Sequence, residues 1–231
     1  GIGSINMEID EIGSNLVGQL DILNTFLELF DVGKIKQKLI KNTLENIRNE
    51  EVDGRTPTNA MLYGTPAKLL NGSKTEDELM SMLEIGYARR CFFGYSRGGC
   101  RATDLTPEQI FDLMTDKTTD NFVEWLSNQL AQLADPINFN QSIEMTRDVS
   151  LLLIEYRLAC EAKASLLPEH EEIRKAELSH RYFKAMKLAG TYAFIDGAPQ
   201  ITEEHLYHAI KLAEESGMAL DKLLTRERNY V

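Results

Sequence analysis

The chain has 231 residues, of which 43% are hydrophobic and 26% are charged, and its formal net charge is −11 at pH 7. This is the composition of an ordinary globular protein with one large domain or two small ones. No apolar run reaches the roughly 18 residues of a membrane-spanning helix, and no secretory signal pattern opens the chain, so we expect a cytoplasmic protein, in the host cytoplasm if viral, with no membrane partner. The acidic charge argues against nonspecific nucleic-acid binding by the whole surface, although not against binding by a local basic segment.

The first informative pattern lies at the start of the chain, where Ile5, Met7 and Ile9 alternate with polar residues and Asp10-Glu11 follows. Alternation with a period of two predicts a strand with one buried face. Because open α/β sheets bind ligands at the carboxyl ends of their strands, we expect the acidic pair at a ligand-binding edge. The alternatives are an exposed acidic turn, and a pair of which one acid binds Mg²⁺ and the other activates water in nucleotide hydrolysis.

A helix is predicted over 16–30, ended by Gly33, and a second amphipathic helix over 35–47. The second helix carries a basic cluster made of Lys34, Lys36, Lys38 and Lys41. These lysines alternate with Ile and Leu and not with aromatic residues, which favours a solvated helix face. Local contact with single-stranded DNA is the other interpretation.

The short apolar run 59–66, ended by Gly64-Thr65-Pro66, predicts a second strand. Thr65 then lies at a strand end, either as a turn residue or as a polar group that bonds the attacking water or the γ-phosphate. A helix is predicted over 75–83, with Thr75 and Glu78 as its capping box.

Two arginines, Arg89 and Arg90, come next and precede an aromatic run, 91–95, that we expect to be a strand. One interpretation is a salt-bridged surface pair. The other is a cation that stabilises a phosphoryl group in the transition state from a neighbouring subunit, a role that suits the planar, permanently charged guanidinium.

The rest of the chain has a helical pattern only. Thr106-Pro107 is a helix start signal, and helices are expected over 121–133, 142–166 and 170–194, with a last one opened by Thr202. His205 and His208 are three residues apart on this last helix, and we interpret them as solvated side chains and not as metal ligands. The composition predicts a mixed α/β part over 1–100 and a helical part over 101–231.

The order of these parts resembles the second half of the P-loop ATPase core of phage and plasmid primase-helicases, and more distantly AAA+ replicative helicases of the MCM and superfamily 3 type. The resemblance implies that Asp10 and Glu11 are the Walker B pair, with Mg²⁺ at Asp10, and that Thr65 is the sensor-1 residue. It implies an arginine finger at Arg89 or Arg90, of which we favour Arg90. The segments 181–189 and 201–212 resemble the helical lid of such ATPases, with Arg181 as the sensor-2 residue.

The resemblance therefore implies an α/β fold, namely a partial P-loop core followed by an all-helical lid, with ATP and magnesium as cofactors. It implies a replicative DNA helicase that hydrolyses ATP at subunit interfaces. The sequence contains no G-x-x-x-x-G-K-[ST] pattern. ATP binding is therefore expected only when a further segment or a second chain supplies the P-loop, and we expect a homo-oligomeric ring or a complex with such a chain.

Two other functions stay open from the residues alone. The first is a magnesium-dependent nuclease that uses Glu8, Asp10 and Glu11 around the metal. The second is a non-catalytic helical assembly module, which the all-helical second part favours.

Overall fold

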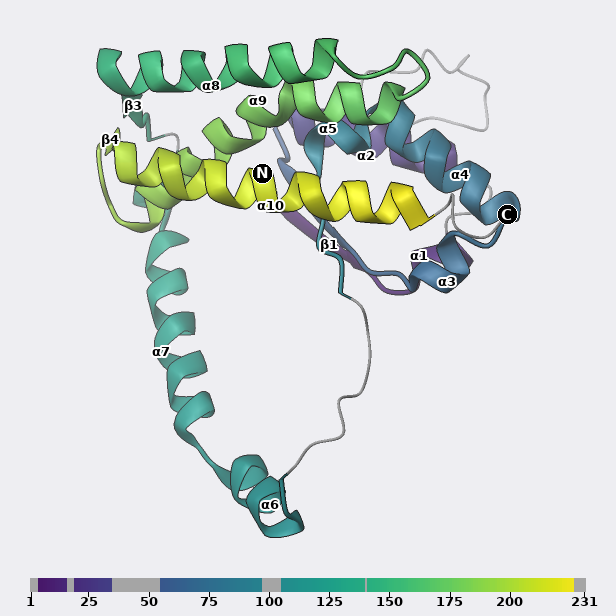
Figure 1. Cartoon of the computed structure of the whole chain (residues 1–231). Coiled ribbons are helices and arrows are strands. Elements are labelled where there is room, and N and C mark those ends of the chain that lie inside the picture. Colours follow the sequence, from purple (N-terminus) through teal and green to yellow (C-terminus); the bar gives the residue numbers. More distant parts are fainter. Residues whose placement is uncertain (1–3, 16–18, 35–54, 97–104, 140, 227–231) are drawn as a thin grey trace, which may run out of the picture.

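The computed structural model describes residues 4–15, 19–34, 55–96, 105–139 and 141–226. The described part is mostly helical and has two small sheets of two strands each (Figure 1). The predicted helix over 35–47, with Lys36, Lys38 and Lys41, lies outside the described residues.

Two of the three strands predicted in the first part are present. β1 (Ile5–Ile9) pairs in parallel with β2 (Thr58–Leu62), in a register that places Ile5 opposite Thr58 and Ile9 opposite Leu62. Parallel strands are normally covered on both faces, yet most residues of these two are exposed. Within the described residues each strand has a single partner, so a complete P-loop ATPase core is not seen there.

The first part also contains several short helices. They are α1 (Ile12–Asn15), α2 (Leu20–Val32), α3 (Pro66–Leu69), α4 (Lys74–Met82), the wider turn η1 (Leu83–Tyr87) and α5 (Ala88–Arg90). Gly33 ends α2 in the left-handed conformation with φ of 68°, as expected for a C-terminal glycine.

Two local predictions in this part were wrong. The N-cap of α4 is Ser73, whose hydroxyl accepts a hydrogen bond from the Thr75 backbone N–H, so the helix starts two residues earlier than a Thr75–Glu78 capping box requires. The aromatic run 91–95 forms no strand. Its backbone is held by side chains of later helices in place of a neighbouring strand, as described below.

An arm extends from the body of the protein and contains α6 (Pro107–Thr115), α7 (Thr118–Leu133) and the short η2 (Pro136–Asn138) (Figure 1). The predicted start signal is confirmed, because Thr106 and Gln109 form a capping box in which each side chain bonds the other's backbone N–H. No residue of α6 or α7 is buried.

Three long helices make up the rest of the chain: α8 (Arg147–Ser165), α9 (Glu172–Ile195) and α10 (Glu203–Arg226). A second parallel pair, β3 (Glu144–Met145) and β4 (Gln200–Ile201), joins the segment before α8 to the turn between α9 and α10. Their shared core is lined by small residues such as Ala185, Ala189 and Ala209, which let the helices approach closely.

The core of the first part is completed by the last helix. Leu83 and Tyr87 pack in one buried cluster with Leu220 and Leu224 of α10. The helical second part is therefore packed directly against the α/β first part.

We expect Leu220→Ala to lower the free energy of unfolding by about 2–5 kcal/mol, because Leu220 is 1% exposed and its loss leaves a cavity between the two parts. Urea denaturation followed by circular dichroism measures this. Leu113→Ala on the arm is the matched control and should change stability by less than about 0.5 kcal/mol, since Leu113 is 63% exposed. Equal effects of the two variants would contradict the packing of α10 against the first part.

Candidate functional site

The carboxyl end of the small sheet brings Asp10-Glu11 beside the segment that follows β2. The Tyr63 N–H donates to the Ile9 carbonyl at 3.0 Å, and the Ile12 N–H donates to the Tyr63 carbonyl at 2.9 Å. The parallel hydrogen-bond ladder thus continues one step past both strands, and Asp10-Glu11 lies between the two residues, Ile9 and Ile12, that bond Tyr63. Asp10-Glu11 therefore lies at the carboxyl end of β1, as the sequence predicted, and ligand binding at this edge stays a prediction.

Glu11 has an unusual backbone. Its φ is 52°, and it is the one non-glycine residue in the described part of the chain with a positive φ. This conformation costs roughly 1–3 kcal/mol and is concentrated at functional sites. The Asp10 Oδ1 accepts the Glu11 N–H at 2.9 Å, which stabilises the turn.

Thr65 lies on the neighbouring loop at the same edge. A Cβ on Gly64 would lie 2.6 Å from Leu69 Cδ1 and 3.0 Å from Ile12 Cγ1, so a side chain here would have to displace Leu69, and this loop packs closely against the residue after Glu11. Thr65 is exposed and begins α3 with its carbonyl, which accepts the N–H groups of Lys68 and Leu69, while its hydroxyl does not cap the helix.

Lys68, one turn into α3, also lies at this end of the sheet, and the sequence analysis did not identify it. Its Nζ lies 3.1 Å from Glu11 Oε2. The signal that was available is the spacing of three residues from Thr65, which places Lys68 one helical turn beyond the strand end. We call Asp10, Glu11, Thr65 and Lys68 the strand-end cluster.

The donor set of the strand-end cluster suits a metal that is held mainly by phosphate and water. Among the described residues, no three His, Cys, Asp or Glu side chains form a group that could hold a metal ion. Glu8, Asp10 and Glu11 therefore do not converge on a common point. Two adjacent carboxylates match Mg²⁺, which keeps several waters and binds one or two carboxylates together with substrate phosphates.

Arg90 makes an internal ion pair. Its Nε lies 2.8 Å from Asp31 Oδ1, its Nη2 lies 2.5 Å from Asp31 Oδ2, and its Nη1 donates to the Gly86 carbonyl at 3.1 Å. Gly86 has φ of 139°, which favours glycine, and a Cβ there would overlap Arg90 Nη1 in its folded-back conformation. The hydrogen bond from Arg90 lowers the pKa of Asp31.

Arg89, the adjacent arginine, is half-buried at the end of α5. Figure 1 shows α5 at a distance from α1 and α3, so one chain does not bring the arginine pair to the strand-end cluster. Lys34, the only described member of the basic cluster, is exposed.

Arg181 lies in a buried ionic cluster on α9 and not on an open surface. Its guanidinium bonds Glu177 through Nε and Nη2 and lies 3.1 Å from Glu214. A Cβ at Gly217 would overlap the Arg181 guanidinium, so α10 accepts this side chain only at a glycine. Burial alone would lower the pKa of Arg181, but the hydrogen bond and charge of Glu177 raise it, and the group stays protonated.

The same cluster holds the segment that follows the arginine pair. Lys184, with a side chain 3% exposed, lies 2.6 Å from Glu177 Oε1 and donates to the Cys91 carbonyl at 3.0 Å. Ser216 Oγ of α10 accepts the Phe93 N–H at 2.7 Å. Burial lowers the pKa of Lys184, and burial of the Cys91 thiol raises its pKa to about 11.

His205 is a helix cap. The Thr202 N–H donates to His205 Nδ1 at 3.1 Å, the His205 N–H donates to Thr202 Oγ1 at 3.3 Å, and His205 Nε2 lies 2.9 Å from Asp196. The imidazole therefore takes the place of the usual Glu or Gln of a capping box. The prediction of a solvated side chain was wrong for His205, which is buried, whereas His208 is exposed.

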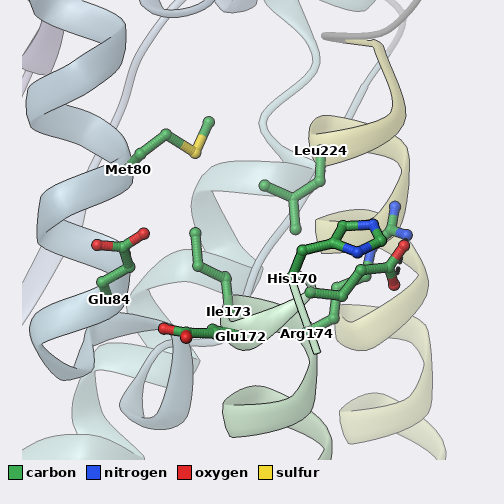
Figure 2. A pocket seen from close by; sticks show the side chains of 8 residues that line it. Met80, Glu84, His170, Glu172, Ile173, Arg174 and Leu224 are labelled. Atoms are coloured by element: carbon green, nitrogen blue, oxygen red, sulfur yellow. Dashed lines mark hydrogen bonds and ion pairs between the residues drawn. The ribbon is translucent and has the colours of Figure 1, made fainter. Parts of the chain in front are cut away.

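A cavity of about 200 Å³ opens between the α4–η1 segment and the starts of α9 and the last turns of α10. Figure 2 shows Met80 and Glu84 on one side and His170, Ile173 and Leu224 facing them. It contains no residue of the strand-end cluster. Its volume is below the range of about 300–1,000 Å³ that small-molecule sites occupy, so it is not the nucleotide site.

Comparison of the chain with protein-family models, with curated proteins and with solved structures gives no match. Among the described helices, none is both long enough and apolar enough to cross a bilayer. The functional argument therefore rests on the geometry above.

We expect Asp31→Asn to destabilise the protein at neutral pH by about 1 kcal/mol or less, because the Asp31–Arg90 pair is partly exposed. The pKa of Asp31 is lowered in the folded protein. Its contribution is therefore present above the unfolded value of 3.8 and is lost as the pH falls through the folded value. Denaturant titrations at several pH values measure this, with Asp112→Asn on exposed α6 as the control. A difference between wild type and Asp31→Asn that persists at the lowest pH would contradict the pair.

We expect Glu177→Gln to destabilise the protein by about 3–5 kcal/mol, because it leaves the buried Lys184 ammonium without its counter-charge. Thermal and urea unfolding measure the loss. Glu161→Gln, which breaks an exposed i,i+4 pair with Arg157, is the control and should cost less than about 1 kcal/mol. Adding Lys184→Met to Glu177→Gln should restore part of the stability. Wild-type stability of Glu177→Gln would instead mean that Arg181 and Lys184 are not held by this cluster.

Proposed function

We propose that this chain carries the hydrolytic part of an ATPase site in a replicative DNA helicase of the primase-helicase type. The observation that carries the proposal is the parallel, in-register pairing of β1 and β2, which places Asp10-Glu11 and Thr65 on adjacent loops at one sheet edge. The sequence alone predicted each strand, and the pairing gives the two polar ends a common location.

The strand-end cluster supports a division of roles. Asp10 would hold Mg²⁺, by way of water, and Glu11 would accept a proton from the attacking water. Thr65 would bond that water or the γ-phosphate. Magnesium bound to ATP supplies charge neutralisation on the phosphates. The strained backbone of Glu11, which the protein maintains at the strand end, is the feature expected of a residue whose carboxylate must be aimed.

The phosphate-binding loop must come from residues that this sequence does not contain. The two strands are largely exposed and each has one partner among the described residues. A parallel pair of this kind is stabilised when more strands join it and helices cover its faces. We infer that the segment or chain that supplies the P-loop also extends this sheet.

The arginine assignment changes within the proposal. Arg90 is bound to Asp31 in its own chain, and its pKa is raised by that hydrogen bond. We therefore propose Arg89 as the finger toward a neighbouring subunit in a ring and Arg90 as its support. Arg181 is held by Glu177 and Glu214, so contact with nucleotide requires that the buried ionic cluster open. Single-stranded DNA would meet the basic cluster that begins at Lys34.

The test is ATP hydrolysis by the protein purified from its native host through a tag on this chain, so that the polypeptide carrying the P-loop is included. We expect Glu11→Gln to lower kcat by roughly 10²–10⁴-fold with ATP binding retained, since it removes a general base. Arg89→Ala should lower kcat by roughly 10³-fold or more. Glu8→Gln on the same strand is the matched control and should leave the rate unchanged.

Three results would count against the proposal. They are a purified complex without ATPase activity, no effect of Glu11→Gln, and equal loss of activity with Glu8→Gln. Divalent-dependent DNA cleavage by this chain alone that needs Glu8 would support the nuclease instead. Among the described residues, Glu8, Asp10 and Glu11 do not form a group of three metal ligands, which argues against the nuclease.

A further inference from the structure

The arm formed by residues 105–139 exposes an apolar surface that no other described segment of its chain covers. Twelve of its large hydrophobic side chains are exposed, and the four aromatic ones among them, Phe111, Phe122, Trp125 and Phe139, are each more than half exposed. On α7, Phe122, Leu126 and Leu130 recur every four residues and form one stripe. Apolar surfaces of this extent on soluble proteins mark interaction sites.

A second apolar stripe lies on α8. Leu151, Ile154 and Leu158 recur at three- and four-residue spacing and are 42%, 49% and 58% exposed, while Leu153 and Cys160 on the opposite face are buried. α7 has 16 residues and α8 has 19, or about 24 and 28 Å, so the two helices that carry the stripes are similar in length.

One chain does not join its own two stripes. In Figure 1, α8 forms the top of the body and the arm extends away from the bottom. The helices α7 and α8 therefore lie at different ends of the molecule. A contact between them requires two copies.

Charge distinguishes this contact from pairing of two arms. Residues 105–139 contain six acidic side chains and one lysine, a net of −5, whereas α8 contains three acidic and three basic side chains and is neutral. Two arms that pair would bring two strongly acidic surfaces together. The neutral α8 stripe accepts the arm without that repulsion.

The exposed area is sufficient for a specific interface. A standard interface buries about 800 Å² on each partner. Aromatic side chains bury roughly 150–250 Å² each when fully covered. The arm as a whole, with four aromatic side chains that are 56–65% exposed and eight exposed aliphatic ones, can therefore supply an area of that order around the α7 stripe.

We propose that the arm of one copy docks its α7 stripe on the α8 stripe of a second copy of this chain. Each copy then gives an arm and receives one. Such a contact is heterologous, and head-to-tail repetition closes into a ring or extends as a filament. The contact does not depend on nucleotide or on the proposed ATPase site.

The test uses two variants of the whole chain and its only tryptophan, Trp125, which lies on the arm. Leu130→Glu alters the α7 stripe, and Leu158→Glu alters the α8 stripe. Each should weaken association by roughly tenfold or more, because a carboxylate becomes buried without a partner. Mass by sedimentation and Trp125 emission across a concentration series are the measurements. Wild type should assemble with blue-shifted emission, and both variants should stay monomeric with emission of exposed tryptophan.

Mixing the two variants is the decisive measurement. Leu130→Glu leaves the α8 stripe unchanged, and Leu158→Glu leaves the α7 stripe unchanged. In the equimolar mixture the arm of Leu158→Glu can therefore dock on α8 of Leu130→Glu, which should give dimers that grow no further. Asn128→Glu, on the polar face of α7, is the matched control and should assemble like wild type. The proposal is overturned if wild type stays monomeric, if Leu158→Glu assembles normally, or if the mixture forms no dimer. Unchanged circular dichroism excludes misfolding as the cause of monomeric variants.

Discussion

The buried ionic cluster of Glu177, Arg181 and Lys184 is the constraint on which the rest of the structure depends. Three charged groups on successive turns of one helix are removed from water, which is unfavourable unless each finds partners. Glu177 bonds both cations, Glu214 of α10 bonds Arg181, and the Cys91 carbonyl accepts from Lys184. The cluster thereby fixes α9 to α10 and fixes both to the segment after the arginine pair.

Through this arrangement α9 and α10 help to position the segment that carries Arg89 and Arg90. The backbone at Cys91 and Phe93 is bonded by Lys184 and Ser216. On the other side of the pair, Lys187 of α9 lies 4.1 Å from the centre of the Phe30 ring, next to the Asp31 that binds Arg90. Movement of α9 or α10 would therefore be transmitted to Arg89 and Arg90. In an ATPase of the proposed type, that linkage would connect lid motion in one subunit to the finger offered to the next.

The sequence predicted the elements better than the interactions. Both strands of the first sheet, the end of α2 at Gly33 and the start of α6 at Thr106 follow from local rules of alternation and capping, and the structure has all of them. The strand predicted over 91–95 does not form, because the partners of its backbone are the side chains of Lys184 and Ser216, 93 and 123 residues later, which no local pattern encodes. The same holds for Arg181, whose partners Glu177 and Glu214 are recognisable as such only when α9 and α10 are packed. Gly86 and Gly217 each leave room for an arginine side chain, Arg90 and Arg181 respectively. A glycine in the sequence indicates that a close contact is possible there, but the sequence does not identify the arginine that makes it.

Two parts of this chain, the β1–β2 sheet and the arm, expose residues that an isolated globular protein would normally bury. Most residues of the parallel strands β1 and β2 are exposed, and no residue of the arm helices α6 and α7 is buried. An isolated two-stranded sheet is marginal in water, and a helix gains most of its stability by packing an apolar face. The two features call for different partners, because a strand edge accepts another strand and a helical stripe accepts another helix. A ring of copies joined through arms and α8 stripes would leave the strand edge of every copy open to the segment that brings the phosphate-binding loop. The two kinds of assembly are thus compatible in one particle, and each stabilises an element that the chain alone leaves exposed.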